Sequence, residues 1–424
     1  MMRSKETFGR SVGAALAFVW LIAFSGIAHA ADGDLDPAFG GGGDGKVRTT
    51  FPQYAFANAV AIASDGKIVA AGAAAGPDVN GVFAVARYDS DGLLDPTFGG
   101  DGRAIAAITP AGGDEANGVL VQPDGKVVAA GTAGRAKFAI ARFDADGTLD
   151  ATFGNAGVRR TDITAGDDIA TQVLMQTDGK IVVVGYGGVN RPSFALARYD
   201  SDGVLDPTFG NGGIVLTPFG LWGIARAAVL QPNGKIVAAG GNGRGWSLAR
   251  YLPDGSLDHS FGNLGKVVTK ALTGDAFAVG LQPDGKIVAT GAYDFYKFAA
   301  ARYTPHGRLD PTFSHDGTLT TNVGGGGEQV STGVAIQANG KILATGSAGP
   351  HEFGDPDVWH FVVMRYRSNG VRDPSFGGDG EVVTTFKGGA NAAAAAMQAD
   401  GRLVVAGGFG AGNADGFALA RYLL

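Results

Sequence analysis

Short apolar segments alternate with turns rich in Gly and Asp along almost the whole chain. Residues 59–72 read AVAIASDGKIVAAG, and residues 83–99 read FAVARYDSDGLLDPTFG. Runs of Val, Ile, Phe and Tyr bounded by Gly and Asp predict β-strands, and the Asp-Gly pair at 65–66 predicts a tight hairpin because Gly accepts a positive φ. Each such unit predicts four antiparallel strands, here named a (59–64), b (67–72), c (83–88) and d, of which residues 45–50 are an example.

The unit recurs seven times. An Asp-Gly or Asn-Gly pair is followed by a basic residue at Lys67, Lys126, Lys180, Lys235, Lys286, Lys341 and Arg402. An Arg followed by an aromatic residue recurs at Arg87, Arg142, Arg198, Arg250, Arg302, Arg365 and Arg421. An Asp three residues before a Phe recurs at Asp36, Asp95, Asp150, Asp206, Asp258, Asp310 and Asp373. A period of about 56 residues predicts a solenoid, a propeller or a tandem array.

The gaps inside the unit differ in how much they vary. The step from the repeated Arg to the next Asp is always 8 residues, whereas the step from the basic residue to the Arg runs from 15 to 24. Insertions gather on exposed loops that the scaffold does not constrain. We therefore expect the b–c connections, and to a lesser degree the d–a connections, to form a variable face.

The two ends of the repeat array complement each other. The array begins with a segment of the d type, LDPAFGGGGDGKVRTT (35–50), and finishes with a strand of the c type, FALARYLL (417–424). Pairing them completes a seventh sheet and removes open sheet edges that invite aggregation. The sequence therefore predicts an all-β protein, a seven-bladed β-propeller closed by its N-terminal strand. The repeat phase also predicts a strand at the alanine run 392–396, although Ala favours helices.

The consensus QPDGKIVAAG…FALARY…DGxLDPTFG resembles the delta-60 repeat family of bacterial β-propellers and, more distantly, the NHL-type propeller repeats. The likeness spans residues 34–424. It implies that strand a is the innermost and strand d the outermost strand of each blade. The family has no settled activity, so the resemblance implies no catalytic residues.

The first 30 residues have a different character. Three basic residues precede an apolar run over residues 12–28, and residues 28–30 (AHA) fit a cleavage site. We expect a secretory signal peptide, with an uncleaved anchor as the alternative, and a single propeller domain over residues 31–424. No later segment is long and apolar enough to span a membrane. The protein is therefore expected to be exported, to the periplasm or the cell exterior.

Composition narrows the classes of partner. The chain contains no Cys, which excludes disulfides and a lipid-modified N-terminal cysteine. Three of its 34 basic and one of its 40 acidic residues lie in the first 30, so removing them changes the net charge from −6 to −8. A negative balance disfavours nucleic acid. We expect a monomer that binds a protein or a polysaccharide.

The repeated side chains are best explained as scaffold. We expect the repeated Phe residues to fill the core. We also expect the repeated Arg and Asp residues to form buried pairs, within a blade or between adjacent blades, with each Arg donating to the Asp or to carbonyls of the LDPTFG turn. A binding ladder of Phe and an anion ring of Arg are the alternatives. The Asp-x-Asp-Gly turns, such as 89–92, superficially resemble calcium loops but lack the Glu of an EF-hand. We therefore expect no cofactor, with calcium or another divalent metal as the alternative.

Candidate ligand-binding residues lie on the connections of the variable face. Acids and amphipathic aromatic residues there suit a sugar, peptide or protein partner, and ordinary loop packing is the alternative. The candidates are Glu115, Asp168, Trp222, Trp246, Asp275, Tyr293, Tyr296 and Glu328. The longest b–c connection reads HEFGDPDVWH, and it offers a metal-ligating set that matches no zinc motif: His351, Glu352, Asp357 and His360.

Three functions fit these features. The first is an exported, non-catalytic propeller that binds a partner through the variable face. The second is a carbohydrate-active hydrolase or lyase, which would bring Glu115, Asp168, Asp275 and Glu328 together in a central funnel. The third is a structural module of the cell surface. Beyond residue 30, the sequence contains no Gly-x-Ser-x-Gly elbow and no Walker-type phosphate loop.

Overall fold

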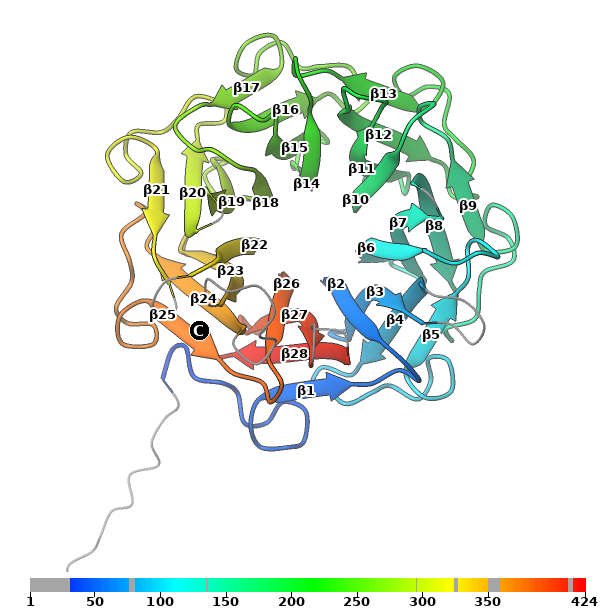
Figure 1. Cartoon of the computed structure of the whole chain (residues 1–424), viewed down its shortest axis with the longest axis horizontal. Coiled ribbons are helices and arrows are strands. Elements are labelled where there is room, and N and C mark those ends of the chain that lie inside the picture. Colours follow the sequence, from blue (N-terminus) through cyan, green and yellow to red (C-terminus); the bar gives the residue numbers. More distant parts are fainter. Residues whose placement is uncertain are drawn as a thin grey trace, which may run out of the picture. The chain divides into compact units, whose positions relative to one another are not determined.

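The computed structural model describes residues 31–75, 81–134, 136–294, 296–323, 327–349, 359–410 and 415–424. In this part of the chain, seven four-stranded antiparallel sheets surround a central opening (Figure 1). The structure therefore confirms the predicted all-β, seven-bladed β-propeller. Within each sheet, or blade, the strands follow the order a-b-c-d from the opening outward, as the family resemblance implied.

Each blade contributes one strand of every kind, and the blades are numbered 1 to 7 in the order of their a strands. The a strands are β2 (Ala55–Ile62), β6 (Glu115–Val121), β10 (Asp168–Met175), β14 (Ile224–Leu230), β18 (Ala276–Leu281), β22 (Gln329–Ile336) and β26 (Ala390–Met397). The b strands are β3 (Ile68–Ala74), β7 (Val127–Ala133), β11 (Ile181–Gly187), β15 (Ile236–Gly241), β19 (Ile287–Tyr293), β23 (Ile342–Ala348) and β27 (Leu403–Phe409). The c strands are β4 (Val82–Tyr88), β8 (Lys137–Phe143), β12 (Ser193–Tyr199), β16 (Trp246–Tyr251), β20 (Lys297–Tyr303), β24 (His360–Tyr366) and β28 (Gly416–Tyr422). The d strands are β5 (Arg103–Ala106), β9 (Val158–Thr161), β13 (Ile214–Thr217), β17 (Lys266–Thr269), β21 (Thr318–Thr321), β25 (Glu381–Thr384) and, in blade 7, β1 (Lys46–Thr49).

The hydrophobic core lies between neighbouring blades. Every residue of β3 and β4 is buried, because the b and c strands are covered on both faces by the adjacent sheets. The a strand β22 instead alternates between buried and half-buried positions, because one face borders the central opening. This difference explains why the b segments are continuous apolar runs while the a segments alternate.

The alanine run of the last repeat is a strand, as the repeat phase predicted. Residues 392–396 lie in β26, which pairs with β27. The sheet overrides the helix propensity of Ala, and small side chains fit the inner strand where the blades converge.

The N-terminal strand closes the ring. β1 pairs antiparallel with β28, placing Lys46 opposite Ala420 and Arg48 opposite Ala418. Upstream of β1, the amide of Gly33 donates to the carbonyl of Leu423 at 2.8 Å. Residues from both ends of the array therefore share blade 7, which confirms the predicted closure.

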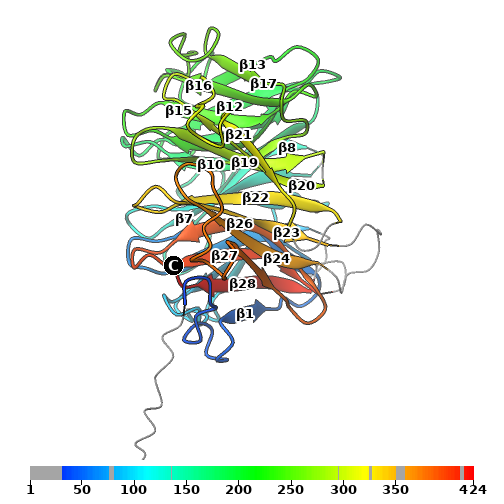
Figure 2. The ribbon, with the colours of Figure 1, turned by 90° about the vertical axis from the view of Figure 1, so that its left-hand side faces the viewer.

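The connections form two separate faces (Figure 2). The a–b and c–d turns form one, called the turn face here, and the b–c and d–a connections form the variable face. Backbone hydrogen bonds tie the b–c connection of one blade to the following d–a connection, as from the amide of Asp114 to the carbonyl of Gly81 at 3.0 Å. The described residues form no helix, and so no helix long and apolar enough to cross a membrane.

Candidate functional site

On the turn face, one cluster of side chains repeats in every blade. The Arg198 Nε lies 2.9 Å from the Asp206 carboxylate, Nη2 donates to the Thr208 hydroxyl at 3.0 Å, and the guanidinium lies 4.6 Å from the ring centre of Phe209. The Nη1 donates to the carbonyl of Pro253 in the next blade at 2.6 Å. The same pair forms in the other blades as Arg87–Asp95, Arg142–Asp150, Arg250–Asp258, Arg302–Asp310, Arg365–Asp373 and Arg421–Asp36.

These clusters confirm the predicted Arg–Asp pair and the predicted role of Phe. In six blades the carbonyl that the Arg contacts belongs to the next blade, not to its own LDPTFG turn, whereas Arg365 reaches the Asp32 carboxylate at 2.9 Å. Each Arg therefore joins two blades. All seven repeated Phe side chains are fully buried: Phe39, Phe98, Phe153, Phe209, Phe261, Phe313 and Phe376.

The repeated Lys also belongs to this cluster, which the sequence did not reveal. Lys286 Nζ lies 3.2 Å from the Asp310 carboxylate. Burial raises the pKa of Asp310, but hydrogen bonds from Thr312 and Lys286 and the charge of Arg302 outweigh it and lower the pKa to about 2. The carboxylate is therefore ionised at neutral pH and is held by two cations.

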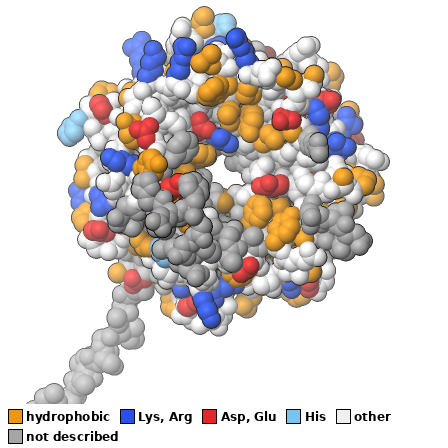
Figure 3. All heavy atoms as spheres, viewed as in Figure 1, with side chains coloured by type: hydrophobic (Ala, Val, Ile, Leu, Met, Phe, Trp, Pro, Cys, Tyr) orange, Lys and Arg blue, Asp and Glu red, His pale blue; other side chains and the backbone are white. Residues whose placement is uncertain are grey.

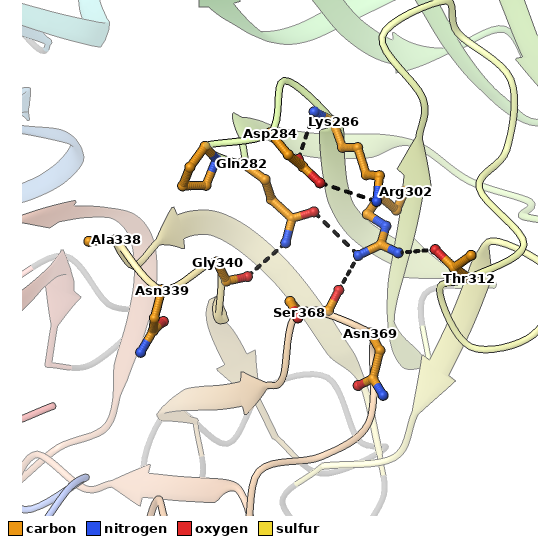
Figure 4. A pocket seen from close by; sticks show the side chains of 11 residues that line it. Gln282, Asp284, Lys286, Arg302, Thr312, Ala338, Asn339, Gly340, Ser368 and Asn369 are labelled. Atoms are coloured by element: carbon orange, nitrogen blue, oxygen red, sulfur yellow. Dashed lines mark hydrogen bonds and ion pairs between the residues drawn. The ribbon is translucent and has the colours of Figure 1, made fainter.

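A cavity of about 460 Å³ lies above this cluster, between blades 5 and 6 (Figure 4). The Arg302 guanidinium contacts Gln282, Thr312 and the carbonyl of Ser368, and the Gln282 amide donates to the carbonyl of Gly340 at 2.7 Å. A matching cavity of about 410 Å³ lies between blades 1 and 2, around Arg87. These polar groups already bind one another across the blade junction, so the cavities are grooves of the scaffold.

A different cavity, of about 520 Å³, lies at the mouth of the central opening on the variable face. Each a strand carries a β-bulge at the same place, where one extra residue interrupts the pairing with the b strand. The extra residue lines this cavity in all seven blades, and we call the set the bulge ring: Asn58, Asn117, Thr171, Arg226, Phe277, Thr332 and Ala393. The same seven residues line a deeper cavity of about 190 Å³.

The side chains of the bulge ring differ from blade to blade, whereas the buried residue that precedes each of them is nearly constant. The buried residue just before each bulge is Ala in six blades and Ser331 in the remaining one. The fold therefore needs a small residue at the supporting position, and it tolerates amide, hydroxyl, guanidinium and aromatic groups one residue later. Variation at half-buried positions that line a cavity is typical of a surface that is shaped for a ligand.

One arc of the mouth, in blades 1 and 2, is polar. The Asn58 amide donates to the Glu115 carboxylate at 2.7 Å and to the Asn117 side-chain oxygen at 3.1 Å. Burial and the nearby charge of Glu115 raise the pKa of Tyr54, whose ring lies 6.5 Å from that of Phe56. This arc offers amide, carboxylate and aromatic groups to a ligand.

The opposite arc, in blades 4 and 5, combines an ion pair with aromatic rings. The Arg226 guanidinium lies 2.9 Å from the Asp275 carboxylate. It also lies 5.3 Å from the ring centre of Phe277 and 5.9 Å from that of Tyr186. In Figure 3, hydrophobic and acidic side chains border the central hollow of this face.

The four acids predicted for a central funnel occupy different positions. Glu115 and Asp275 each lie two residues before a bulge, and Glu115 lines the mouth. Asp168 is fully buried, and its carboxylate accepts the amides of residues 163 and 164 and the ammonium of Lys137. Glu328 is half-buried and precedes β22. Of the four acids, only Glu115 lines the mouth, and Asp275 is paired with Arg226, which also lines it.

The predicted aromatic residues are also divided. Trp222 is 43% and Tyr296 45% exposed. Tyr293 ends β19 and is half-buried. Trp246 is fully buried in the core between blades 4 and 5, where a surface ligand does not reach it.

Most of the predicted metal-ligating set lies outside the described residues: His351, Glu352 and Asp357. His360 begins β24, and burial lowers its pKa. Among the residues that the structure describes, no three His, Cys, Asp or Glu side chains are grouped to hold a metal ion.

Solved structures that resemble this chain share little sequence identity with it. "YCF48 bound to D1 peptide" is 13% identical, with 93% of this chain and 100% of that chain covered and a TM-score of 0.46. Virginiamycin B lyase from Staphylococcus aureus is 11% identical, with 73% and 95% covered and a TM-score of 0.38. The intramolecular trans-sialidase from Ruminococcus gnavus is 10% identical, with 89% and 95% covered and a TM-score of 0.42. At such values these likenesses identify no ligand or reaction for this chain, and no curated protein matches it.

One family profile matches the repeats themselves. Its description is "Domain of unknown function (DUF5122) beta-propeller", and it matches residues 63–98, 122–153, 176–209, 231–261, 282–313, 337–376 and 398–424. Each of the first six segments runs from an a–b turn through the c strand to the LDPTFG turn, and together the seven cover more than half of the chain. The chain therefore belongs to the DUF5122 beta-propeller family.

Proposed function

We propose that this chain is an exported, non-catalytic binding propeller that takes a protein or polysaccharide partner on its variable face, at the mouth of the central opening. The observation that carries the proposal is the bulge ring. Seven equivalent positions line one cavity, and they hold five different kinds of side chain while the buried residue before them stays small.

The chemistry of the mouth supports binding by several weak contacts. Asn58 and Asn117 supply amide donors and acceptors, and Phe277 supplies an apolar surface. Ala393 leaves room in blade 7. A ligand that enters the mouth therefore meets a polar arc, an aromatic arc and an open arc.

The positions of the acids favour binding over hydrolysis. A glycosidase of the usual kind needs two carboxyl groups roughly 5 to 9.5 Å apart, one of which is free to donate a proton. Glu115 accepts a hydrogen bond from Asn58, Asp275 is paired with Arg226, and Asp168 is buried. None of these three carboxylates is placed as an unpaired acid in the cavity.

The experiment is a thermal-shift screen of residues 31–424 against polysaccharides and peptides, repeated with Ala393→Trp. A ligand that binds only the folded protein at 100 times its Kd raises the free energy of unfolding by about 2.7 kcal/mol. We expect a hit whose stabilisation is lost in Ala393→Trp, because the indole fills the mouth.

The matched control is Asn339→Trp, which places the same side chain in the turn-face groove. We expect it to leave the stabilisation unchanged. Stabilisation that survives Ala393→Trp and is lost in Asn339→Trp contradicts the proposal. Stabilisation by no ligand in either class favours a structural module instead.

A further inference from the structure

Trp222 lies on the rim of the variable face, in the d–a connection between β13 and β14. Its side chain is 43% exposed and that of Leu221 is 46% exposed. The amide of the next residue, Gly223, donates to the carbonyl of Pro192 at 2.6 Å, which fixes this connection to the b–c connection of blade 3. The bulge residue Arg226 follows four residues after Trp222, so the rim position leads directly into the mouth.

The indole of Trp222 lies against the backbone of the neighbouring b–c connection. A Cβ atom at Gly243 would overlap the Cζ2, Cε2 and Nε1 atoms of the ring, so only glycine leaves room for it. Gly243 also has a φ of +73°, which favours glycine. This b–c connection is the shortest of the seven, with 15 residues from Lys235 to Arg250. The indole is therefore supported on one side while part of its surface is exposed to solvent.

Three exposed basic residues lie on the backbone segments beside this ring. Arg191 adjoins Pro192, whose carbonyl accepts the bond from Gly223, and Arg244 adjoins Gly243. A Cβ atom at Gly245 would lie 3.0 Å from the Cα of Lys270, which places Lys270 beside the same loop. Among the described residues, the side chains of these three cations form no hydrogen bond or ion pair. We call Arg191, Trp222, Arg244 and Lys270 the basic rim.

Of three acids near the basic rim, two already have cationic partners and the third, Asp167, is exposed. Asp275 is paired with Arg226, and Asp168 is buried beside Lys137. Asp167 is exposed at the edge, where its carbonyl accepts the amide of Gly188. In Figure 3, hydrophobic side chains gather beside the central hollow over blades 3 and 4, with Lys and Arg on their outer side.

We infer that the basic rim binds an acidic polysaccharide, with one sugar ring stacked on Trp222 and the carboxylates of the polymer held by Arg191 and Arg244. The face of an aromatic ring is electronegative, and it attracts the weakly positive C–H groups of a sugar ring. A guanidinium binds a carboxylate through two parallel hydrogen bonds. This inference rests on the proposed function and names its ligand class.

The test is affinity electrophoresis of residues 31–424 in gels that contain either polygalacturonate or neutral dextran. We expect retardation by polygalacturonate, weakened by salt because the contacts are charged, and little retardation by dextran. Trp222→Ala and the double variant Arg191→Ala/Arg244→Ala should each weaken binding by at least about tenfold. The controls are Leu216→Ala and Arg160→Ala, which remove exposed residues of the outer strands β13 and β9, and they should bind like the parent protein.

The outcomes separate this inference from the proposed function. Equal retardation by dextran, or full binding by Trp222→Ala, overturns the basic rim as an acidic-glycan site. A ligand that binds the parent and Trp222→Ala equally but not Ala393→Trp leaves the proposed function standing and overturns this inference. If the protein binds a peptide and no polysaccharide, the proposed function also stands and this inference is overturned. If no ligand of either class binds, the proposed function fails and the inference fails with it.

Discussion

The turn face and the mouth of the central opening are built from the same seven repeats. The turn face has the same side chains in every blade, whereas the side chains at the mouth differ between blades. On the turn face, an Arg, an Asp and a Phe occur in every blade and bind one another, as Arg198, Asp206 and Phe209 do. At the mouth, equivalent positions hold residues as different as Arg226 and Ala393. Repetition therefore marks the contacts that join blades, and variation marks the surface that we propose meets a partner.

The largest effect on stability should come from acid, which protonates the paired Asp residues of the turn face. Burial raises the pKa of Asp373, but hydrogen bonds from Lys341 and Ser375 and the charge of Arg365 outweigh it and lower the pKa to about 2. The pKa of Asp310 is likewise lowered to about 2. Because the unfolded carboxyls bind protons near pH 4, stability is fully present above that pH and falls as the pH drops from about 4 toward 2. Denaturant unfolding measured from pH 7 to 2 checks this, and stability that stays constant to pH 2 contradicts it.

Removing one guanidinium from the turn face should give the next largest effect. Arg198→Met removes the closer of the two cations that hold the buried Asp206 and should lower the free energy of unfolding by about 3–5 kcal/mol. Arg226→Met is the matched change at the mouth, where the Arg is 31% exposed. It should cost less than about 1 kcal/mol. Chemical denaturation measures both, and equal losses would remove the distinction between the regions.

A smaller effect tests the contacts between outer strands. In six blades a buried Tyr hydroxyl bonds a Thr of the preceding blade, as Tyr251 bonds Thr217 at 2.9 Å. At the remaining junction the equivalent residues are Phe143 and Ala106, so both partners of the hydrogen bond are replaced together. Phe143→Tyr alone should destabilise by about 1 kcal/mol because its hydroxyl is buried without a partner.

Adding Ala106→Thr to Phe143→Tyr should recover that loss. A double-mutant cycle, with each variant measured by chemical denaturation, gives the coupling between the two sites, which we expect to be about 1 kcal/mol and favourable. The Tyr251→Phe variant is a control that breaks an existing bond of the same kind. Additive effects of the two changes would show that these hydroxyls do not interact.

The smallest effect on stability is expected in the bulge ring. Phe277→Ala removes a side chain that lines the mouth and should change the free energy of unfolding by no more than about 0.5 kcal/mol, as for other surface substitutions. It should nevertheless weaken binding of the partner in the thermal-shift assay. A loss of several kcal/mol would instead place Phe277 among the residues that hold the fold.

The features that repeat in every blade could be predicted from the sequence. Seven copies reveal which positions are fixed, and this predicted the blades, the closure by residues 46–49 and the Arg–Asp pairs. The innermost place of strand a came from the family resemblance, not from spacing. Whether the Arg contacts stay within a blade or reach the next one was left open, because spacing along the chain carries no information about neighbours in the ring.

The mouth could be predicted only in part, because a bulge shifts the alternation of the a strand. Glu115 and Asp168 both follow another acid at a strand start, and the sequence treats them alike. In the structure, Asp168 corresponds to the buried Asp114, and Glu115 corresponds to Ile169 one residue later. Aligning the repeats at the small residue before the bulge is the signal that would have separated them and revealed the bulge ring.

Amide hydrogen exchange with and without saturating ligand tests the central claim most directly. The account predicts new protection at the starts of the a strands and in the adjoining connections, including residues 115–118, 219–226 and 242–246, and unchanged exchange in the Asp-Gly turns at 63–67 and 282–286. Protection confined to those turns would show that the repeated face, not the mouth, meets the partner.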